Sequence, residues 1–346
     1  MTQKVVITGG AGFLGLHLAQ RFAKDHDVVL YDIADYPPDD YAANVQKIKG
    51  DVRNRYRLEQ AFQGASIVVH CAAGLPLLPR DEIISTNVQG TQNVLDAAKS
   101  AGVGRVIQVS STAVYGVPEK HPLYETDPMV GVGPYGESKI TAERLCEQYR
   151  AHGMIVSVVR PKTFIGTYRL GVFQILYEWV KEGHAIPVIG DGYNRYQLLE
   201  VEDLVDAIQL LATHSDNAKV NNTFNVGAME FHTVREDVGA LCEYAHSGAH
   251  VLATSAGLVK PVLAAAESLK LSPLYKWVYG TADKDSFVST EKLQALGWKA
   301  QYSNSQALIR SYQWYLDHYQ EAEQGTGTHH RVAWDQGALK LVKRFI

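Results

Sequence analysis

The sequence predicts an α/β fold: a doubly wound parallel sheet followed by a smaller carboxyl-terminal α/β lobe. Short apolar runs alternate with helix-length segments through the first half of the chain, which is typical of right-handed βαβ crossovers. A glycine-rich turn at residues 9–15 follows the first apolar run directly. The 346 residues are 46% hydrophobic, which is enough for one large core or two unequal ones.

Each element follows from these patterns. We expect buried strands at 5–8, 28–32, 45–49, 67–70 and 106–110, and helices at 82–101 and from 134 to about 149. Beyond Arg160-Pro161 the alternation weakens, and 170–181, 201–213 and 233–244 are predicted as helices between short strands. We therefore expect a sheet domain at 1–165, a second lobe at 166–325 and an amphipathic tail at 326–346, with some later elements returning to the sheet domain.

Composition excludes several classes of protein. The 33 basic and 37 acidic residues give a formal charge of -4, which disfavours nucleic acid as a partner. Cys71, Cys146 and Cys242 are far apart and lack metal-ligand spacing, so we expect no disulfide and no metal site. The first strand is not preceded by a signal-peptide pattern, and charges and prolines interrupt the apolar stretch 252–278, which favours a surface or core helix. We expect a cytoplasmic protein without a transmembrane segment.

The turn at 9–15, GGAGFLG, has a GxxGxxG spacing and opens an apolar helix. Such glycines permit a tight turn and a close approach of backbone N–H groups to a pyrophosphate, which the helix N-terminus also favours. Asp32 ends the second strand, where a carboxylate binds the adenosine ribose hydroxyls and repels a 2′-phosphate. The pattern predicts NAD rather than NADP, with contacts from Gly9, Gly12, Phe13, Leu14, Gly15 and Asp32.

A second constellation indicates hydride-transfer chemistry. Tyr135 and Lys139 are four residues apart at the start of a predicted helix and share one face. We expect the ammonium of Lys139 to lower the phenol pKa of Tyr135 and also to hold the nicotinamide ribose. Hydroxyls at Ser110, Ser111 and Thr112 follow the strand that ends at the same edge of the sheet, where they can orient a substrate oxygen.

Several further segments lie in a characteristic order along about the first 230 residues. These are Asp51-Val52, His70-Cys71-Ala72-Ala73, NVQGT at 87–91, SSTAVYG at 110–116, YGESK at 135–139, Arg160-Pro161 and Val201-Glu202-Asp203. Together with the glycine turn, they resemble the extended short-chain dehydrogenase/reductases, especially the NAD-dependent epimerase/dehydratase group that acts on nucleotide sugars. The resemblance implies a Rossmann fold, NAD as cofactor, and a homodimer formed through the helices near 82–101 and 134–149.

The resemblance also implies roles for individual residues. Ser111, Tyr135 and Lys139 are similar to the catalytic triad of the family, with Thr112 a weaker alternative to Ser111. The cofactor contacts implied by position are Asp51, Val52, Cys71, Ala72, Ala73, Asn87, Lys139 and Pro161. Asn87 either supports the site or makes only a hydrogen bond at a helix start, and both interpretations stay open.

The substrate-binding half departs from the family pattern. Thr163 stands where many nucleotide-sugar enzymes have an asparagine that binds the diphosphate. Arg195 falls where the family often has a diphosphate-binding arginine, and Arg169 is a second candidate. A surface role is open for both arginines and is favoured for Arg169.

The sequence therefore leads to one main hypothesis and three alternatives. The main one is an NAD-dependent epimerase of a nucleoside-diphosphate sugar, acting at C4 through a transient keto intermediate. The alternatives are a dehydrogenase or reductase of a less polar alcohol or ketone, similar to hydroxysteroid dehydrogenases, a dinucleotide-binding scaffold without turnover, and a dehydratase. The last is disfavoured because Thr112-Ala113 supplies no acid/base pair beside Ser111.

Overall fold

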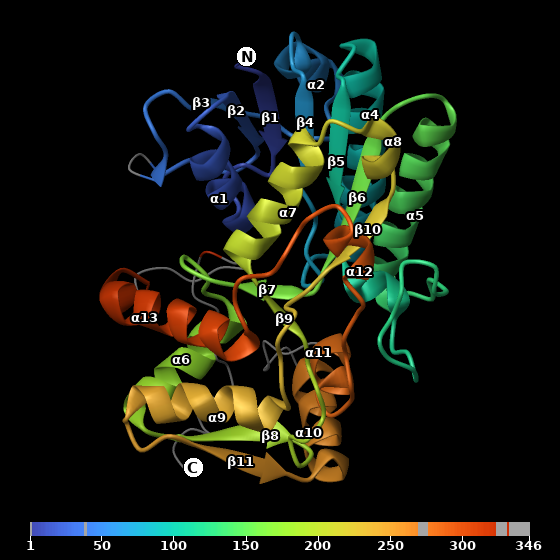
Figure 1. Cartoon of the computed structure of the whole chain (residues 1–346). Coiled ribbons are helices and arrows are strands. Elements are labelled where there is room, and N and C mark those ends of the chain that lie inside the picture. Colours follow the sequence, from blue (N-terminus) through green and yellow to red (C-terminus); the bar gives the residue numbers. More distant parts are fainter. Residues whose placement is uncertain (1, 38–39, 269–275, 323–330, 332–346) are drawn as a thin grey trace.

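The computed structural model describes residues 2–37, 40–268, 276–322 and 331, and a parallel seven-stranded sheet forms its centre (Figure 1). The strand order is β10-β6-β5-β4-β1-β2-β3. The strands are β1 (Lys4–Thr8), β2 (Asp27–Asp32), β3 (Gln46–Lys49), β4 (Ile67–His70), β5 (Arg105–Val109), β6 (Val156–Pro161) and β10 (Thr223–Val226). The predicted doubly wound α/β fold is confirmed, and all five expected strands belong to this sheet.

Helices cover both faces of the sheet. On one face lie α1 (Phe13–Phe22) and α7 (Val201–Thr213), which pack against each other. On the other lie α2 (Arg55–Phe62), α4 (Gly90–Ser100) and α5 (Gly133–Ala151). Each helix buries an apolar stripe, so that Leu16 and Leu204 join the first core and Leu58 and Val94 the second.

A second lobe packs below the carboxyl edge of the sheet (Figure 1). It contains α6 (Val172–Glu182), α9 (Val234–Ala245), α13 (Asn304–Ala322), and the strand pairs β8 (Ala185–Ile189) with β11 (His250–Thr254) and β7 (Thr163–Ile165) with β9 (Leu198–Glu200). Its core is aromatic, with Tyr177, Trp179, Tyr312 and Tyr315 buried together. The remaining helices are α3 (Arg80–Ile84), α8 (Asn217–Val220), α10 (Ala256–Ser268), α11 (Lys276–Thr281) and α12 (Glu291–Gln294).

The chain returns from the second lobe to the sheet. After β9, α7 packs on β5 and β6, and β10 extends the sheet beside β6. Leu293 of α12 and Trp298 also join the core under α1 and α7. The sheet domain therefore includes segments well beyond residue 165, because β6 offers a free edge that β10 covers.

Two expected helices differ in the structure. The helix predicted at 82–101 is divided into α3, a π-helical turn at Ser85–Gln89, and α4. The stretch 252–278 is not one helix, because residues up to Thr254 pair with β8 as strand β11 before α10 begins. The tail expected at 326–346 lies outside the described residues except for Arg331.

The helices of the described ranges include none that is both long enough and apolar enough to cross a membrane.

Candidate active site

The glycine turn joins β1 to α1 and leaves no room for side chains. Gly9 has φ +73°, and a Cβ there would lie 2.6 Å from the backbone nitrogen of Ala72. A Cβ on Gly15 would lie 2.2 Å from the carbonyl oxygen of Gly9, so the first turn of α1 packs directly on the loop. Helix α1 begins at Phe13 with no side-chain cap, which leaves its first N–H groups directed toward the loop. This geometry is suited to a phosphate group.

Asp32 ties the end of β2 to the same turn. Its Oδ2 accepts a hydrogen bond from the N–H of Ala11 at 3.0 Å, and its Oδ1 accepts one from Ala34 at 2.9 Å. The carboxylate is thus held beside the glycine turn, as the sequence predicted for a ribose-binding residue.

Asp51 and Val52 follow β3 and lie on the wall beside Asp32. The Nε of Arg53 donates to both oxygens of Asp51, at 3.0 and 2.9 Å, and these hydrogen bonds lower the pKa of Asp51. Val52 is 5% exposed and packs beneath Gly90. The opposite wall is the segment after β4, Cys71, Ala72 and Ala73, where burial raises the pKa of the Cys71 thiol to about 12. Cys71 is therefore no nucleophile at neutral pH.

Asn87 lies within the π-helical turn and is 2% exposed. Its Oδ1 accepts from the N–H of Gly74 at 2.7 Å, and its Nδ2 donates to Ser138 Oγ at 2.9 Å. The side chain therefore fastens the loop after β4 to α5 beside Tyr135, and it does not line the cavity.

The structure brings Ser111, Tyr135 and Lys139 together. Ser111 caps the short 3₁₀ turn after β5, with its Oγ accepting from the N–H of Ala113 at 3.1 Å. Tyr135 and Lys139 lie on one face of α5, and the Lys139 ammonium lies 5.7 Å from the centroid of the Tyr135 ring. Lys139 Nζ donates to the carbonyl of Val109 at 3.0 Å, which fixes the side chain against the end of β5.

The expected lowering of the Tyr135 pKa by Lys139 is not found in the structure. Burial raises the pKa of the Tyr135 phenol to about 12, while a hydrogen bond with Ser111 opposes that rise. Burial also lowers the pKa of Lys139 to about 8. Desolvation is the largest cause of both pKa shifts because both groups lie inside the protein.

One cavity of about 450 Å³ connects these groups, from Asp32 at one end to Tyr135 and Lys139 at the other. Its size lies in the range of cofactor sites. Of the sequence-predicted cofactor contacts it is lined by Gly9, Gly12, Phe13, Leu14, Gly15, Asp32, Asp51, Val52, Cys71, Ala72, Ala73 and Lys139. The glycine cradle, the ribose-binding carboxylate and the Tyr–Lys pair fit NAD in one orientation, with the nicotinamide end at Tyr135.

Residues absent from the sequence-based prediction also line this cavity. They include Arg53, Thr86, Val109, Phe164 and Arg331. Phe164 stacks on Phe13 with ring centroids 5.6 Å apart. Arg331 Nη1 donates to the carbonyl of Ala11 at 3.1 Å, although it is 320 residues away in sequence. No local pattern marks such a residue, because only the tertiary fold brings it to the loop.

The expected substrate residues lie in different surroundings. Thr163 is in β7 beside Tyr196, with the two hydroxyls 3.4 Å apart. Arg169 is 6% exposed and stacks over Phe13 and Phe173, so the surface position favoured from sequence is wrong. Arg195 is exposed and stacks over Phe231 and Phe287, at 4.6 and 5.0 Å from their centroids. Pro161 ends β6 and does not line the NAD cavity.

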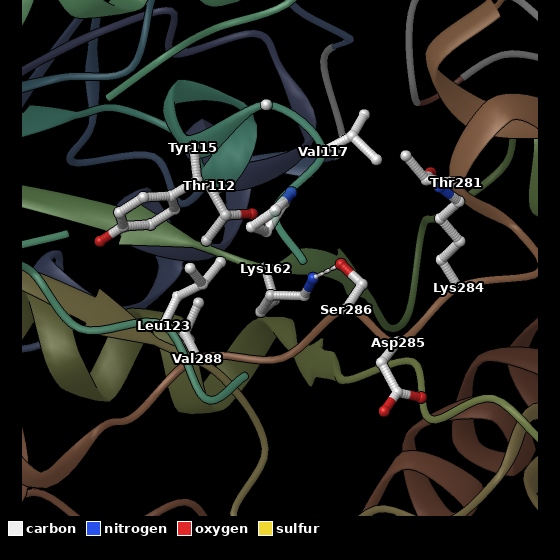
Figure 2. Close-up of a pocket in the computed structure, with 12 residues that line it drawn as sticks. Thr112, Tyr115, Val117, Leu123, Lys162, Thr281, Lys284, Asp285, Ser286 and Val288 are labelled. Carbon is white, nitrogen blue, oxygen red and sulfur yellow. Dashed lines mark hydrogen bonds between the residues drawn. The ribbon is translucent and has the colours of Figure 1, made fainter. Parts of the chain in front are cut away.

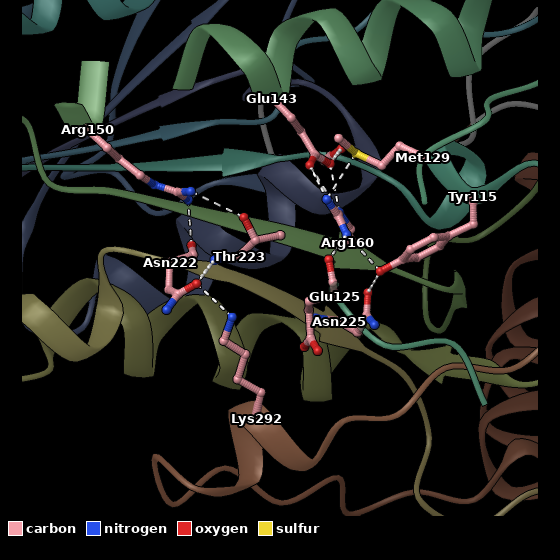
Figure 3. Close-up of polar contacts among 11 residues, drawn as sticks. Tyr115, Glu125, Met129, Glu143, Arg150, Arg160, Asn222, Thr223, Asn225 and Lys292 are labelled. Atoms are coloured by element: carbon pink, nitrogen blue, oxygen red, sulfur yellow. Dashed lines mark hydrogen bonds and ion pairs between the residues drawn. The ribbon is translucent and has the colours of Figure 1, made fainter. Parts of the chain in front are cut away.

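A buried ionic network lies behind the catalytic trio (Figure 3). Arg160 Nη2 pairs with Glu143 Oε2 at 2.6 Å, and Arg160 Nη1 donates to the Tyr115 hydroxyl at 2.8 Å. Glu143 also accepts a short hydrogen bond from Ser110. This network joins β5, β6 and α5 at the end of the sheet where the trio lies.

The fold and site together define an NAD-dependent enzyme of the short-chain dehydrogenase/reductase type. The family model described as "NAD dependent epimerase/dehydratase family" matches residues 5–227. The chain belongs to this family, as the resemblance predicted.

Comparison with individual proteins agrees with this assignment. The uncharacterised protein y4nG of Sinorhizobium fredii is 32% identical, over 99% of this chain and 86% of its own. A dTDP-glucose 4,6-dehydratase of Streptomyces griseus is 31% identical over 71% and 79%, and a UDP-glucose 4-epimerase of Rhizobium leguminosarum is 26% identical over 90% and 97%. The solved UDP-glucose 4-epimerase of Thermotoga maritima has a TM-score of 0.76 at 22% identity, over 91% of this chain and 99% of that one.

Proposed function

We propose that the enzyme interconverts a nucleoside-diphosphate sugar and its C4 epimer, with NAD retained between turnovers. The observation that carries the proposal is that Tyr135 and Lys139 line the same cavity as the glycine turn and Asp32, while Ser111 forms a hydrogen bond with Tyr135. UDP-glucose 4-epimerases among the relatives support the same reaction.

The chain's own groups perform the proton transfer. The Ser111 hydroxyl orients the reacting sugar oxygen, and Tyr135 removes its proton as general base and later returns it. NAD, when bound, supplies the hydride acceptor and donor, and the charge of its oxidised ring favours the phenolate form of Tyr135. Lys139 would hold the ribose of the cofactor. A keto sugar that turns over in the cleft before reduction gives the epimer, so the reaction has no net redox change.

The proposal extends to substrate contacts and assembly. Thr163, Arg169 and Arg195 are assigned to the diphosphate side of the substrate. A homodimer would form through α4 and α5, which lie together on one face of the sheet (Figure 1). The free thiols Cys71, Cys146 and Cys242 support a reducing compartment, the cytoplasm.

The test is conversion without added cofactor. Purified enzyme is incubated with UDP-, dTDP- and GDP-sugars, and the sugar protons are followed by NMR. Many turnovers to an epimer support the proposal, whereas a 4-keto-6-deoxy product would assign a dehydratase instead. Failure to convert any nucleotide sugar, with or without NAD, would contradict the proposal.

Tyr135→Phe tests the proposed base. Loss of the phenol should lower kcat by about 1,000-fold, since general acid–base catalysis contributes roughly 10²–10⁴-fold. NAD affinity should stay within about threefold, because the ring still lines the cavity. Tyr149→Phe, on the same helix but bonded to Asp96, is the matched control. Unchanged turnover in Tyr135→Phe would remove this residue from the mechanism.

One observation favours a second function, a dehydrogenase or reductase of a less polar alcohol. Leu258 and Val262 lie one turn apart on α10 and are 73% and 67% exposed, which is an apolar surface suited to a hydrophobic ligand. This enzyme would consume NAD stoichiometrically. NADH formed at 340 nm with a sterol alcohol, and absent with nucleotide sugars, would select it.

A further inference from the structure

Lys162 is a buried cation that the proposed mechanism does not use. Its side chain is 3% exposed, and its Nζ donates to the Ser286 hydroxyl at 2.7 Å and lies 4.8 Å from the centroid of the Tyr196 ring. Both partners are neutral. In the described ranges, Lys162 forms no ion pair with a carboxylate, and burial alone lowers its pKa, to about 7.

A buried ammonium without a counter-charge lowers the stability of the folded protein, and an anionic ligand would remove that cost. An ammonium taken out of water without a counter-charge loses solvation that one hydroxyl and one aromatic ring do not replace. Titratable groups kept in this condition cluster at functional sites. Among the described residues no carboxylate supplies the missing counter-charge, so the arrangement is suited to an anionic ligand.

Lys162 lines a small cavity of about 10 Å³ between the two lobes (Figure 2). This volume accommodates about one polar atom, such as a water or one carboxylate oxygen. Thr112 lies on one side of the cavity, next to Ser111, and Lys284, Asp285 and Ser286 lie on the other.

Each side of the cavity is tied to a residue of the proposed substrate site. Thr112 follows Ser111 in the chain, and its Oγ1 donates to the carbonyl of Pro161 at 3.4 Å. Ser286 N–H donates to the carbonyl of Arg195 at 2.8 Å, and Asp285 Oδ1 accepts from the Arg195 N–H at 2.8 Å. Lys162 therefore lies between the segment that carries Ser111 and the segment bonded to Arg195.

We propose that Lys162 determines specificity by binding a carboxylate of the sugar, so that the preferred substrate is a nucleoside-diphosphate hexuronic acid. The inference rests on the proposed function and names its substrate class. One carboxylate oxygen fills the cavity and accepts a charge-assisted hydrogen bond from the ammonium. A neutral hydroxymethyl group would leave the ammonium without a counter-charge.

The experiment compares UDP-glucuronate and UDP-glucose on the intact, NAD-loaded enzyme by NMR. We expect the wild-type kcat/KM to favour the uronate by about 12- to 160-fold, since a hydrogen bond to a charged group is worth about 1.5–3 kcal/mol. Lys162→Met should remove this preference by lowering only the uronate value, and Lys162→Gln gives a second, polar variant. Lys219→Met, an exposed lysine on α8, is the control and should match wild type.

A pH profile distinguishes carboxylate binding by Lys162 from a purely structural role of this residue. With wild-type enzyme, the ratio of kcat/KM for the uronate to that for the neutral sugar should fall above about pH 7, because the free lysine then loses its proton. Lys162→Arg should flatten that fall, since a guanidinium stays protonated. Tyr115, Tyr196, Lys284 and Asp285 also face Lys162 or its cavity, so the fall is assigned to Lys162 only if Lys162→Met abolishes it.

Two results would overturn the inference while epimerisation stands. One is an equal wild-type preference for the two sugars, and the other is a Lys162→Met variant that affects both equally. If neither sugar turns over, the wider set of UDP-, dTDP- and GDP-sugars decides the proposed function separately, and calorimetric binding of both UDP-sugars to NAD-loaded enzyme still tests Lys162. Equal affinities would then contradict the role assigned to it.

Discussion

Arg160 and Lys162 lie two residues apart and are equally buried, at 3% exposed, but their surroundings are opposite. Arg160 Nε donates to Glu143 at 3.0 and 3.1 Å, and its other nitrogens reach the Tyr115 hydroxyl and the carbonyl of Glu125 (Figure 3). Lys162 donates to the Ser286 hydroxyl (Figure 2) and otherwise contacts the ring of Tyr196. A cation whose donors are all satisfied serves the fold, whereas one left without a counter-charge is available to a ligand.

Position in the fold explains the difference. Arg160 lies within β6, where α5 and the segment after β5 supply polar partners. Lys162 lies just beyond the last pair of the sheet, Pro161 with Val226, where the second lobe begins. Its partners there come from the segment near Ser286, and that segment also carries the contacts to Arg195.

The largest effect should come from breaking the paired cation. Glu143→Gln removes the charge that compensates Arg160 and should lower the free energy of unfolding by about 3–5 kcal/mol, the cost of breaking a buried ion pair. Urea denaturation measures it. Glu147→Gln on the exposed side of the same helix is the control and should change stability by less than about 0.5 kcal/mol. A small effect of Glu143→Gln would mean that Arg160 does not need its partner.

Removing the unpaired cation should have the opposite sign. Lys162→Met replaces a buried, uncompensated ammonium by an apolar side chain of similar length and should raise the free energy of unfolding at pH 6 by about 2 kcal/mol. Thermal or urea unfolding of the ligand-free enzyme provides the measurement. A lower free energy of unfolding for Lys162→Met would show that the interactions of the Lys162 ammonium stabilise the fold, as those of Arg160 do.

The increase in the free energy of unfolding caused by Lys162→Met should depend on pH. Because the folded pKa of Lys162, about 7, lies below the ordinary lysine value of 10.5, the unfolded chain binds more protons between these two pH values. The penalty that Lys162 imposes is therefore fully present below pH 7 and disappears as the pH rises toward 10.5. The stability difference between Lys162→Met and wild type should shrink over this range, and a constant difference would contradict the lowered pKa.

The smallest effect concerns a neutral member of the Arg160 network. Tyr115→Phe removes the hydroxyl that accepts from Arg160 and donates to Asn225 Oδ1 at 2.7 Å. This substitution should lower the free energy of unfolding by about 1–2 kcal/mol. Tyr56→Phe, at 68% exposed, is the control. If the two substitutions change the free energy of unfolding equally, the Tyr115 hydrogen bonds do not stabilise the Arg160 network.

Local patterns accounted for most of the cofactor half of the molecule. The strands, the glycine turn, Asp32 and the Tyr135–Lys139 pair depend on residues that are close in sequence or follow consecutive strands, so spacing alone locates them. Prediction was wrong for the Tyr135 pKa and for the surface position of Arg169, since both depend on burial by distant elements. It also did not indicate the π-helical turn around Asn87.

The sequence by itself determined the fold class, the family and the NAD site of this protein, because hydrophobic period and glycine spacing act over a few residues. Only the tertiary structure decided which buried charges are paired. Arg160 and Lys162 stand in the same short segment, yet Glu143 reaches one from α5 and Ser286 reaches the other across 124 residues. Solvation and pairing of a charge depend on every element around it, and sequence spacing does not encode that.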